Sequence, residues 1–134
     1  MAKGGTLAQP HVMLKITNKN GETVKTFTHS KEKKINIRPE ILNVIRESLH
    51  DVVLRGTAQN KGLEVYKAAG KTGTAETGRP GDNHAWFAGY APHDKPQYVF
   101  LVLVEHTSEH GGAIAVPIAK ELLSFLYPEL AQSS

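Results

Sequence analysis

The sequence predicts an α+β fold, in which a mainly antiparallel sheet is flanked by helices. Three observations support this class. Extended segments follow one another over residues 68–76, 85–91 and 97–105. Two segments with apolar residues at helical spacing bracket them, over residues 39–55 and 112–127. The turns between the strands are short, which favours antiparallel neighbours because a parallel crossover needs a dozen or more residues.

A β-hairpin is predicted near the start of the chain. Residues 11–18 alternate apolar and polar side chains from Val12 to Ile16, the pattern of a half-buried strand. Asn20-Gly21 is typical of a tight hairpin turn, and residues 22–27 return as the second strand. We expect this pair to form an edge ribbon.

The first helix is predicted over residues 39–55. Pro39 fits the first turn, Arg55 suits the negative end of the helix dipole, and Gly56 suits the stop. Its apolar face is formed by Ile41, Ile45, Leu49 and Val52 or Val53.

The second and third strands of the sheet are apolar on both faces. Trp86 and Tyr90 lie on one side of residues 85–91 with Phe87 on the other, and an apolar run follows over residues 98–104. We therefore expect both strands to be buried on both faces, in the middle of a sheet that helices cover from each side. The helix over residues 112–127 is expected to lie across one of those faces.

One short motif carries recognisable chemistry, Lys71-Thr72-Gly73 followed by Thr74. The lysine supplies positive charge, the hydroxyl a directed hydrogen bond, and the glycine room for a substrate backbone beside the strand. Strand alternation points Lys71 and Gly73 one way, with Thr72 and Thr74 the other. Alone, the triplet is a weak signal, because a surface hairpin with an incidental lysine would show it too.

Residues 1–127 resemble, nearly end to end, the C-terminal part of the transpeptidase domain of class B penicillin-binding proteins, and most of all the elongation type, penicillin-binding protein 2. The resemblance rests on Ala2-Lys3-Gly4-Gly5-Thr6, Gln9-Pro10-His11, Gly56-Thr57-Ala58, residues 70–75, residues 84–92, the strand 98–105 and Gly111-Gly112. It implies a partial penicillin-binding or β-lactamase-like transpeptidase fold. Residues 1–134 would form one segment of that domain, incomplete on its N-terminal side.

The resemblance also implies roles for the motif. The hydroxyls of Thr72 and Thr74 would hold the terminal carboxylate of the substrate or of a β-lactam, with Gly73 leaving room beside them. Lys71 would raise the local positive potential and take part in the proton relay. The backbone N–H of Thr74 would be one of two donors to the oxyanion. Lys71 and Thr74 are thus the expected catalytic residues, with no cofactor and no metal.

Two further motifs of such a site, a Ser-x-x-Lys nucleophile and a Ser-x-Asn, are not found in convincing form. Ser30-Lys31-Glu32-Lys33 has the right spacing, but more lysines surround Lys33 and no apolar periodicity would bury it. We expect that lysine to be exposed and protonated, and therefore not to serve as a base. The chain by itself is expected to be inactive.

The implied function is that of a peptidoglycan D,D-transpeptidase, which cross-links stem peptides and binds penicillin. The parent protein would be attached to the inner membrane, with its catalytic domain on the periplasmic or extracellular face, and would work with the cell-elongation machinery. The fragment itself is expected to be soluble. Two alternatives stay open: a D,D-carboxypeptidase or β-lactamase relative, which shares the triplet, and a non-catalytic module for binding or assembly.

Composition argues against other classes of function. The net charge is +3, but the basic cluster of Lys31, Lys33 and Lys34 lacks the aromatic residues of a nucleic-acid platform, so we interpret it as a solvated loop. His106 and His110 fall between a strand and a helix, where a packing or capping role is favoured over metal binding. His84 begins a strand beside Lys71 and could hydrogen-bond in the floor of the groove.

Self-association is the last expectation from the sequence. If upstream elements normally cover one face of the sheet, their absence exposes the apolar strand around residues 98–105. Monomers rarely expose a large apolar patch. We therefore expect the fragment to form a homo-oligomer.

Overall fold

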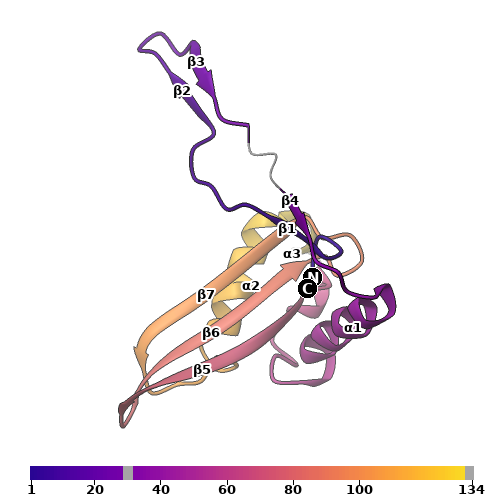
Figure 1. Cartoon of the computed structure of the whole chain (residues 1–134). Helices are drawn as coiled ribbons and strands as arrows, with labels where there is room; N and C mark the ends of the chain where they lie inside the picture. Colours follow the sequence, from indigo (N-terminus) through magenta and orange to yellow (C-terminus); the bar gives the residue numbers. More distant parts are fainter. Residues whose placement is uncertain (29–31, 132–134) are drawn as a thin grey trace.

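A three-stranded antiparallel sheet forms the body of the molecule (Figure 1). The computed structural model describes residues 1–28 and 32–131. Its sheet consists of β5 (Ala69–Arg79), β6 (Asp82–Ala91) and β7 (Tyr98–Thr107), in the order β5-β6-β7. The predicted antiparallel order is confirmed. The strands are longer than predicted because the turn that joins β5 to β6 is tighter than the loop expected over residues 77–83.

Two long helices accompany this sheet. α1 (Pro39–Arg55) has the predicted bounds, with proline in its first turn. α2 (Ala115–Leu126) begins three residues later than predicted, because the residues that follow Gly111 form a hydrogen-bonded turn. A 3₁₀ turn η1 (Glu64–Tyr66) and a short helix α3 (Pro128–Ala131) complete the helical elements that are described.

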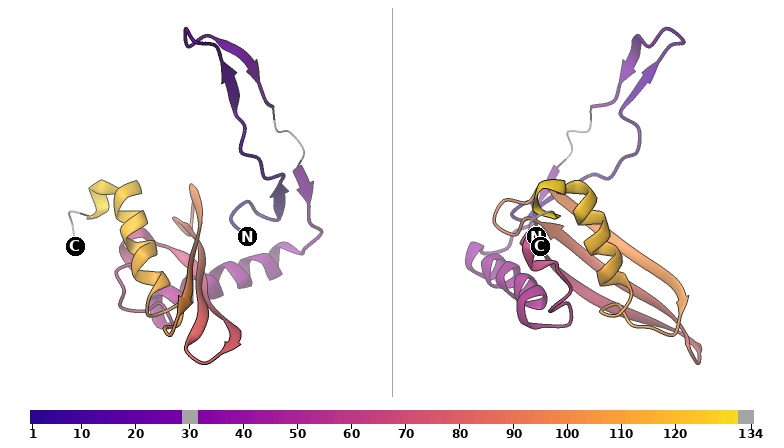
Figure 2. Two further views of the ribbon diagram at one scale, coloured as in Figure 1. Left: turned by 90° about the vertical axis from the view of Figure 1, so that its left-hand side faces the viewer. Right: turned by 180° about the vertical axis from the view of Figure 1, so that it is seen from behind.

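The N-terminal strands form a separate extension. β1 (Thr6–Ala8) pairs with β4 (Glu32–Lys34), and beyond this ribbon the hairpin of β2 (Lys15–Thr17) and β3 (Thr23–Thr26) projects away from the body (Figures 1 and 2). We call residues 9–28 the arm. The predicted hairpin is confirmed, but its strands are shorter than the predicted segments 11–18 and 22–27. Every residue of β2 and β3 is exposed.

The core lies on one face of the sheet. α2 packs across that face, here called the inner face (Figure 2). Phe87 from β6 and Leu123 from α2 are fully buried there, together with Val53 from the end of α1. α1 itself lies along the edge of β5, where its start lies on the opposite side of the sheet from α2 (Figure 2). The inner face is thus covered by α2, whereas α1 lies only beside the edge strand β5.

The expectation that both strands are buried on both faces is wrong for β7, whereas on β6 the side chains opposite to Phe87 include the buried Tyr90 and the half-buried Trp86. The outer face carries the side chains that alternate with the core residues: Trp86, Ala88, Tyr90, Val99, Leu101 and Leu103. Of these, Val99 is 74% exposed, Leu101 62% and Leu103 40%. The apolar sequence calls for a second covering layer. Among the described residues, however, only α2 lies across the sheet. The exposed apolar face that underlies the self-association argument is therefore present.

Among the residues that the structure describes, no helix is long and apolar enough to cross a membrane.

Candidate functional site

The Lys71–Thr74 segment lies in β5, at one edge of the sheet. Its register with β6 pairs Lys71 with Ala88 and Thr72 with Phe87. Directly opposed residues of an antiparallel pair share a face, so Lys71 lies on the outer face and Thr72 on the inner face. The predicted alternation of the motif agrees with this register. The side chains of Lys71 and Thr72 therefore lie on opposite faces of the edge strand β5.

Thr72 is joined to a second threonine from another element. The hydroxyl oxygens of Thr72 and Thr57 are 2.7 Å apart, a hydrogen bond in which either can donate. Thr57 follows the end of α1, where the backbone turns at Gly56. A side chain at Gly56 would place its Cβ 2.8 Å from the Cα of Val52, so a glycine is needed for this sharp exit. Sequence reasoning assigned no role to Thr57. The signal available was the Gly56-Thr57-Ala58 motif.

Lys71 is exposed, and its side chain folds onto the backbone of the next residue. Its Nζ donates a hydrogen bond of 2.8 Å to the backbone carbonyl of Thr72. The salt bridges among the described residues do not include Lys71. Its ammonium group is therefore able to interact with an anion that approaches this edge, since the group has three donors and only one is used here.

Two glycines support the motif from behind. A Cβ on Gly111 would lie 2.3 Å from the carbonyl oxygen of Trp86 and 2.7 Å from that of Gly73. A Cβ on Gly112 would lie 2.7 Å from the carbonyl oxygen of Thr57. These approaches are shorter than any side chain allows, so the turn before α2 fits tightly against both segments that form the site. The pattern Gly111-Gly112 was visible in the sequence, but the packing partner was not.

α1 is fixed to the sheet by polar contacts that set the position of Thr57. Arg46 donates a hydrogen bond of 2.7 Å to the carbonyl of His93. His50 Nδ1 lies 2.8 Å from the carbonyl of Ala68, and because a carbonyl only accepts, His50 is the donor. The rings of His50 and His93 stack with centroids 4.5 Å apart. These contacts hold the helix to the start of β5 and to the turn after β6.

A histidine cluster lies at the other end of the sheet. His106 Nδ1 is 2.6 Å from a carboxylate oxygen of Asp82, and this hydrogen bond, together with the charge of Asp82, raises the pKa of His106. His84 Nδ1 accepts a weak hydrogen bond of 3.3 Å from the backbone N–H of His106. This partner is on β7 and not in the Lys71–Thr74 segment. His84 is paired opposite Ala75. In residues 1–28 and 32–131, no group of three or more potential ligands is arranged to hold a metal.

The Ser-x-x-Lys match is only partly described. Ser30 and Lys31 lie outside the described residues. Lys33, the lysine of that match, is exposed in β4, as expected from its neighbours.

Comparison with known proteins identifies the relatives of this arrangement. Residues 1–124 match the family model for the penicillin binding protein transpeptidase domain. A curated relative is the stage V sporulation protein D of Bacillus subtilis, 36% identical over 136 residues that cover 95% of this chain and 21% of the relative. The chain thus spans about a fifth of that protein.

Solved structures show the same fold. A D,D-transpeptidase domain from Eggerthella lenta is 28% identical with a TM-score of 0.77, over 95% of this chain and 29% of that one. Penicillin-binding protein A of Mycobacterium tuberculosis, solved as a ceftriaxone acyl-enzyme complex, is 27% identical with a TM-score of 0.76, over 92% of this chain and 29% of that one. The likeness is therefore to part of a larger domain.

Proposed function

The chain belongs to the penicillin-binding protein transpeptidase family, as part of one such domain, and we propose that it supplies the carboxylate-binding strand of a peptidoglycan D,D-transpeptidase. The observation that carries this proposal is the pairing of the Thr72 and Thr57 hydroxyls at 2.7 Å, on the edge strand that also carries the exposed ammonium of Lys71. One hydroxyl orients the other, and the Lys71 ammonium, which donates to the Thr72 carbonyl, supplies a cation at the same strand edge. This is the donor set that a terminal carboxylate requires.

The hydrogen bond between the threonines favours one direction when substrate is bound. A carboxylate only accepts hydrogen bonds, so Thr72 must donate to it. The Thr57 hydroxyl then donates to Thr72 Oγ1, which polarises the Thr72 hydroxyl and strengthens its own donation. Thr74 supplies the second hydroxyl of the clamp. Gly73 between them has no side chain to keep the substrate backbone from the strand.

The backbone of the same strand offers a donor to the oxyanion that forms during acyl transfer. The carbonyl of Thr72 accepts a bond from Lys71 at the edge of β5, away from β6. Backbone groups of alternate residues point to the same side of a strand, so the N–H of Thr74 is directed to this open edge. A donor placed where negative charge develops contributes about 3 kcal/mol to transition-state stabilisation in comparable hydrolases.

The nucleophile is assigned to a serine outside this sequence. Its oxygen would attack the carbonyl between the two terminal D-alanines, the C–N bond would break, and D-alanine would leave with the serine proton. The acyl group would then pass to the amine of a neighbouring stem peptide, which restores the serine. A β-lactam would acylate the same serine and use the same clamp for its carboxylate. Lys71 would take part in the proton transfers.

Within this proposal, the whole protein is attached to the inner membrane and works with the cell-elongation machinery. The assignment rests on the resemblance of the sequence to penicillin-binding protein 2. A carboxypeptidase or β-lactamase would use water instead of an amine as the acyl acceptor, and its clamp would be the same. A non-catalytic binding module would instead need neither Lys71 nor Thr72.

A chimera tests the clamp. This chain would replace the matching segment of Mycobacterium tuberculosis penicillin-binding protein A, and acylation by a labelled penicillin would be timed. Thr72→Val keeps the shape and removes the hydroxyl, which should slow acylation roughly ten- to a hundredfold, since a hydrogen bond to a charged group contributes about 1.5–3 kcal/mol. Lys71→Ala should slow it at least as much. Thr23→Val in β3 is the matched control and should have no effect.

The isolated chain provides the complementary measurement. It should form no covalent adduct with the labelled penicillin on long incubation, because the serine is supplied elsewhere. Acylation of the Thr72→Val and Lys71→Ala chimeras at the parental rate would show that these residues are not the clamp. A stoichiometric adduct on the isolated chain that Ser30→Ala abolishes would instead place the nucleophile in this sequence.

A further inference from the structure

The turn that joins β5 to β6 encloses a polar cavity, at the opposite end of the sheet from the arm (Figure 1). The cavity has a volume of about 350 Å³. Its lining residues are Glu76, Gly78, Arg79, Pro80, Gly81 and Asn83. Gly78 and Gly81 have positive φ values of 81° and 71°, which only glycine adopts at little cost, so the sequence specifies this turn. A carboxylate and a guanidinium, those of Glu76 and Arg79, therefore lie beside one hollow.

These two charges are not neutralised within the part of the chain that is described. The salt bridges there include neither Glu76 nor Arg79. Across the hairpin Arg79 is paired with Asp82, but the Asp82 carboxylate is already bound to His106 at 2.6 Å. Glu76 is paired with Asn83, whose side chain is neutral. Both charged groups are exposed and able to bind a ligand of opposite charge.

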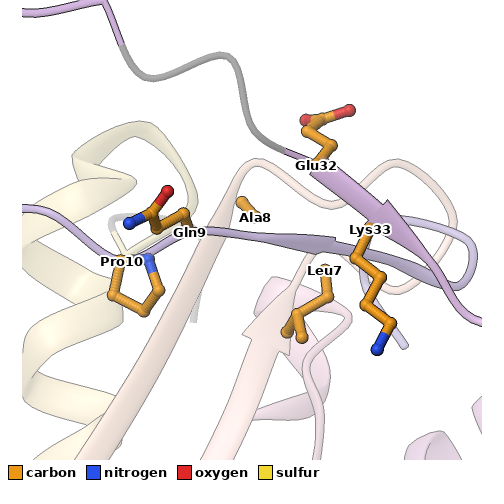
Figure 3. A pocket seen from close by; sticks show the side chains of 6 residues that line it. All are labelled: Leu7, Ala8, Gln9, Pro10, Glu32 and Lys33. Carbon is orange, nitrogen blue, oxygen red and sulfur yellow. The ribbon is translucent and has the colours of Figure 1, made fainter.

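A larger hollow beside the β1–β4 ribbon differs in this respect. It has a volume of about 480 Å³, and the apolar Leu7 and Pro10 form part of its lining (Figure 3). Glu32 and Lys33 point away from each other there (Figure 3). The Glu32 carboxylate is 2.9 Å from the Lys3 ammonium, so it is already paired. Free charges of both signs therefore favour the β5–β6 turn as the site for a polar ligand.

The strand sets the position of this cavity relative to the proposed clamp. α1 lies beside the start of β5, and Thr57 after it meets Thr72, so this helix leaves the later part of the edge open. Glu76 follows Thr74 by two residues, which is about 7 Å along a strand. A peptide with its terminal carboxylate at Thr72 and Thr74 would run along the open edge toward Arg79, antiparallel to β5.

We propose that the β5–β6 turn binds a zwitterionic side group of the stem peptide that acylates the serine, the end of a diamino dicarboxylic acid residue next to the two D-alanines. The inference rests on the proposed function, because the clamp determines where the peptide lies. Glu76 accepts hydrogen bonds from the ammonium group. Arg79 donates two parallel N–H bonds to the carboxylate, the pairing that a planar guanidinium favours. A lysine at the same place would leave Arg79 without an anion.

Two model peptides titrated into the full chain of 134 residues test the proposal. Both end in D-alanyl-D-alanine, and the residue before it is either the diamino dicarboxylic acid or lysine. NMR spectra of the labelled chain would follow the amide signals of Glu76 and Asn83, which line the cavity. The dicarboxylic peptide should bind roughly threefold to fivefold more tightly than the lysine peptide, which is the effect of one additional exposed ion pair.

Three variants separate the turn from the clamp. Arg79→Gln should remove the preference by weakening the dicarboxylic peptide alone, whereas Glu76→Gln should weaken both peptides because both carry the ammonium group. Thr72→Val should weaken both and leave the preference unchanged. Lys95→Gln, at an exposed position after β6, is the control with the same change in charge as Arg79→Gln, and it should bind both peptides as the parent chain does.

The outcomes distinguish this proposal from the clamp itself. Equal affinity of the parent chain for the two peptides, with binding that depends on Thr72, would overturn the proposed subsite and leave the clamp in place. A preference that Arg79→Gln does not reduce would also overturn the subsite. A preference that Arg79→Gln removes, with binding that Thr72→Val does not change, would support the subsite and count against the clamp. Failure of the chain to bind either peptide would overturn both.

Discussion

The arm and the sheet are built from the same kind of alternating strand, yet they differ in what their apolar side chains contact. In the sheet, Phe87, Phe100 and Val102 are buried against α2. In the arm, Val24 is 67% exposed and Leu14 66%, and the hairpin contacts no layer among the described residues. An isolated two-stranded ribbon is only marginally stable in water, whereas strands that pack against a helix form a stable structure. Alternating apolar residues therefore stabilise a strand only where another element covers their side chains.

Truncating a core side chain should separate the two regions most clearly. Leu123→Ala removes a fully buried side chain between α2 and the sheet, and should lower the free energy of unfolding by about 2–5 kcal/mol. Val24→Ala in β3 should lower it by less than about 0.5 kcal/mol. Urea denaturation followed by circular dichroism measures both. Similar losses for the two variants would show that the arm packs as tightly as the body.

The next largest difference in stability is expected between substitutions at Gly111 in the body and Gly21 in the arm. Gly111→Ala would force its Cβ into the carbonyls of Trp86 and Gly73, and the overpacking should destabilise the body by about 1–3 kcal/mol. Gly21→Ala has no atom within 4 Å of the new Cβ, and its positive φ of 83° strains only the hairpin turn.

The readouts for these glycine variants differ by region. Global unfolding should shift for Gly111→Ala and stay unchanged for Gly21→Ala, whose effect should be confined to faster amide hydrogen exchange in β2 and β3. A fall in global stability with Gly21→Ala would mean that the arm and the sheet unfold together.

The smallest expected effect is the pH dependence of the sheet. The pKa of His106 is raised in the folded chain by the hydrogen bond and charge of Asp82. This pair stabilises the fold fully below the ordinary pKa of histidine, about 6.5, and the contribution disappears as pH rises through the raised value. Asp82→Asn should therefore lower the melting temperature more at pH 6 than at pH 9, and His106→Gln should behave alike. A loss that does not change with pH would contradict the assignment.

Sequence patterns predicted the fold where one element meets another element of the same chain. The bounds of α1 follow from Pro39 and Gly56, and the order of the sheet follows from its short turns. The prediction that β7 is buried on both faces was wrong because the pattern of Val99 to Leu103 indicates what the strand is suited to, not what is present to cover it. The strands of the arm were overestimated for the same reason.

The candidate site was predictable in part. The motif Lys71–Thr74 and its alternation are local properties, so the sequence was enough to place them on a strand. Thr57 meets Thr72 across 15 residues, and Gly111 meets Gly73 across 38, and no local pattern encodes such contacts. Whether these residues act as the clamp is a question for the chimera.

The β1–β4 ribbon has a practical consequence. Thr6 pairs with Lys34 and Ala8 with Glu32, and the Lys3 ammonium is 2.9 Å from the Glu32 carboxylate, so the chain leaves the body and returns to it at one place. The closure entropy of a loop grows only slowly with its length. The tip at Asn20-Gly21 is therefore a suitable insertion point for a fluorescent domain or an affinity tag, which would report on the position of the protein while the sheet, its helices and the threonine pair keep their geometry.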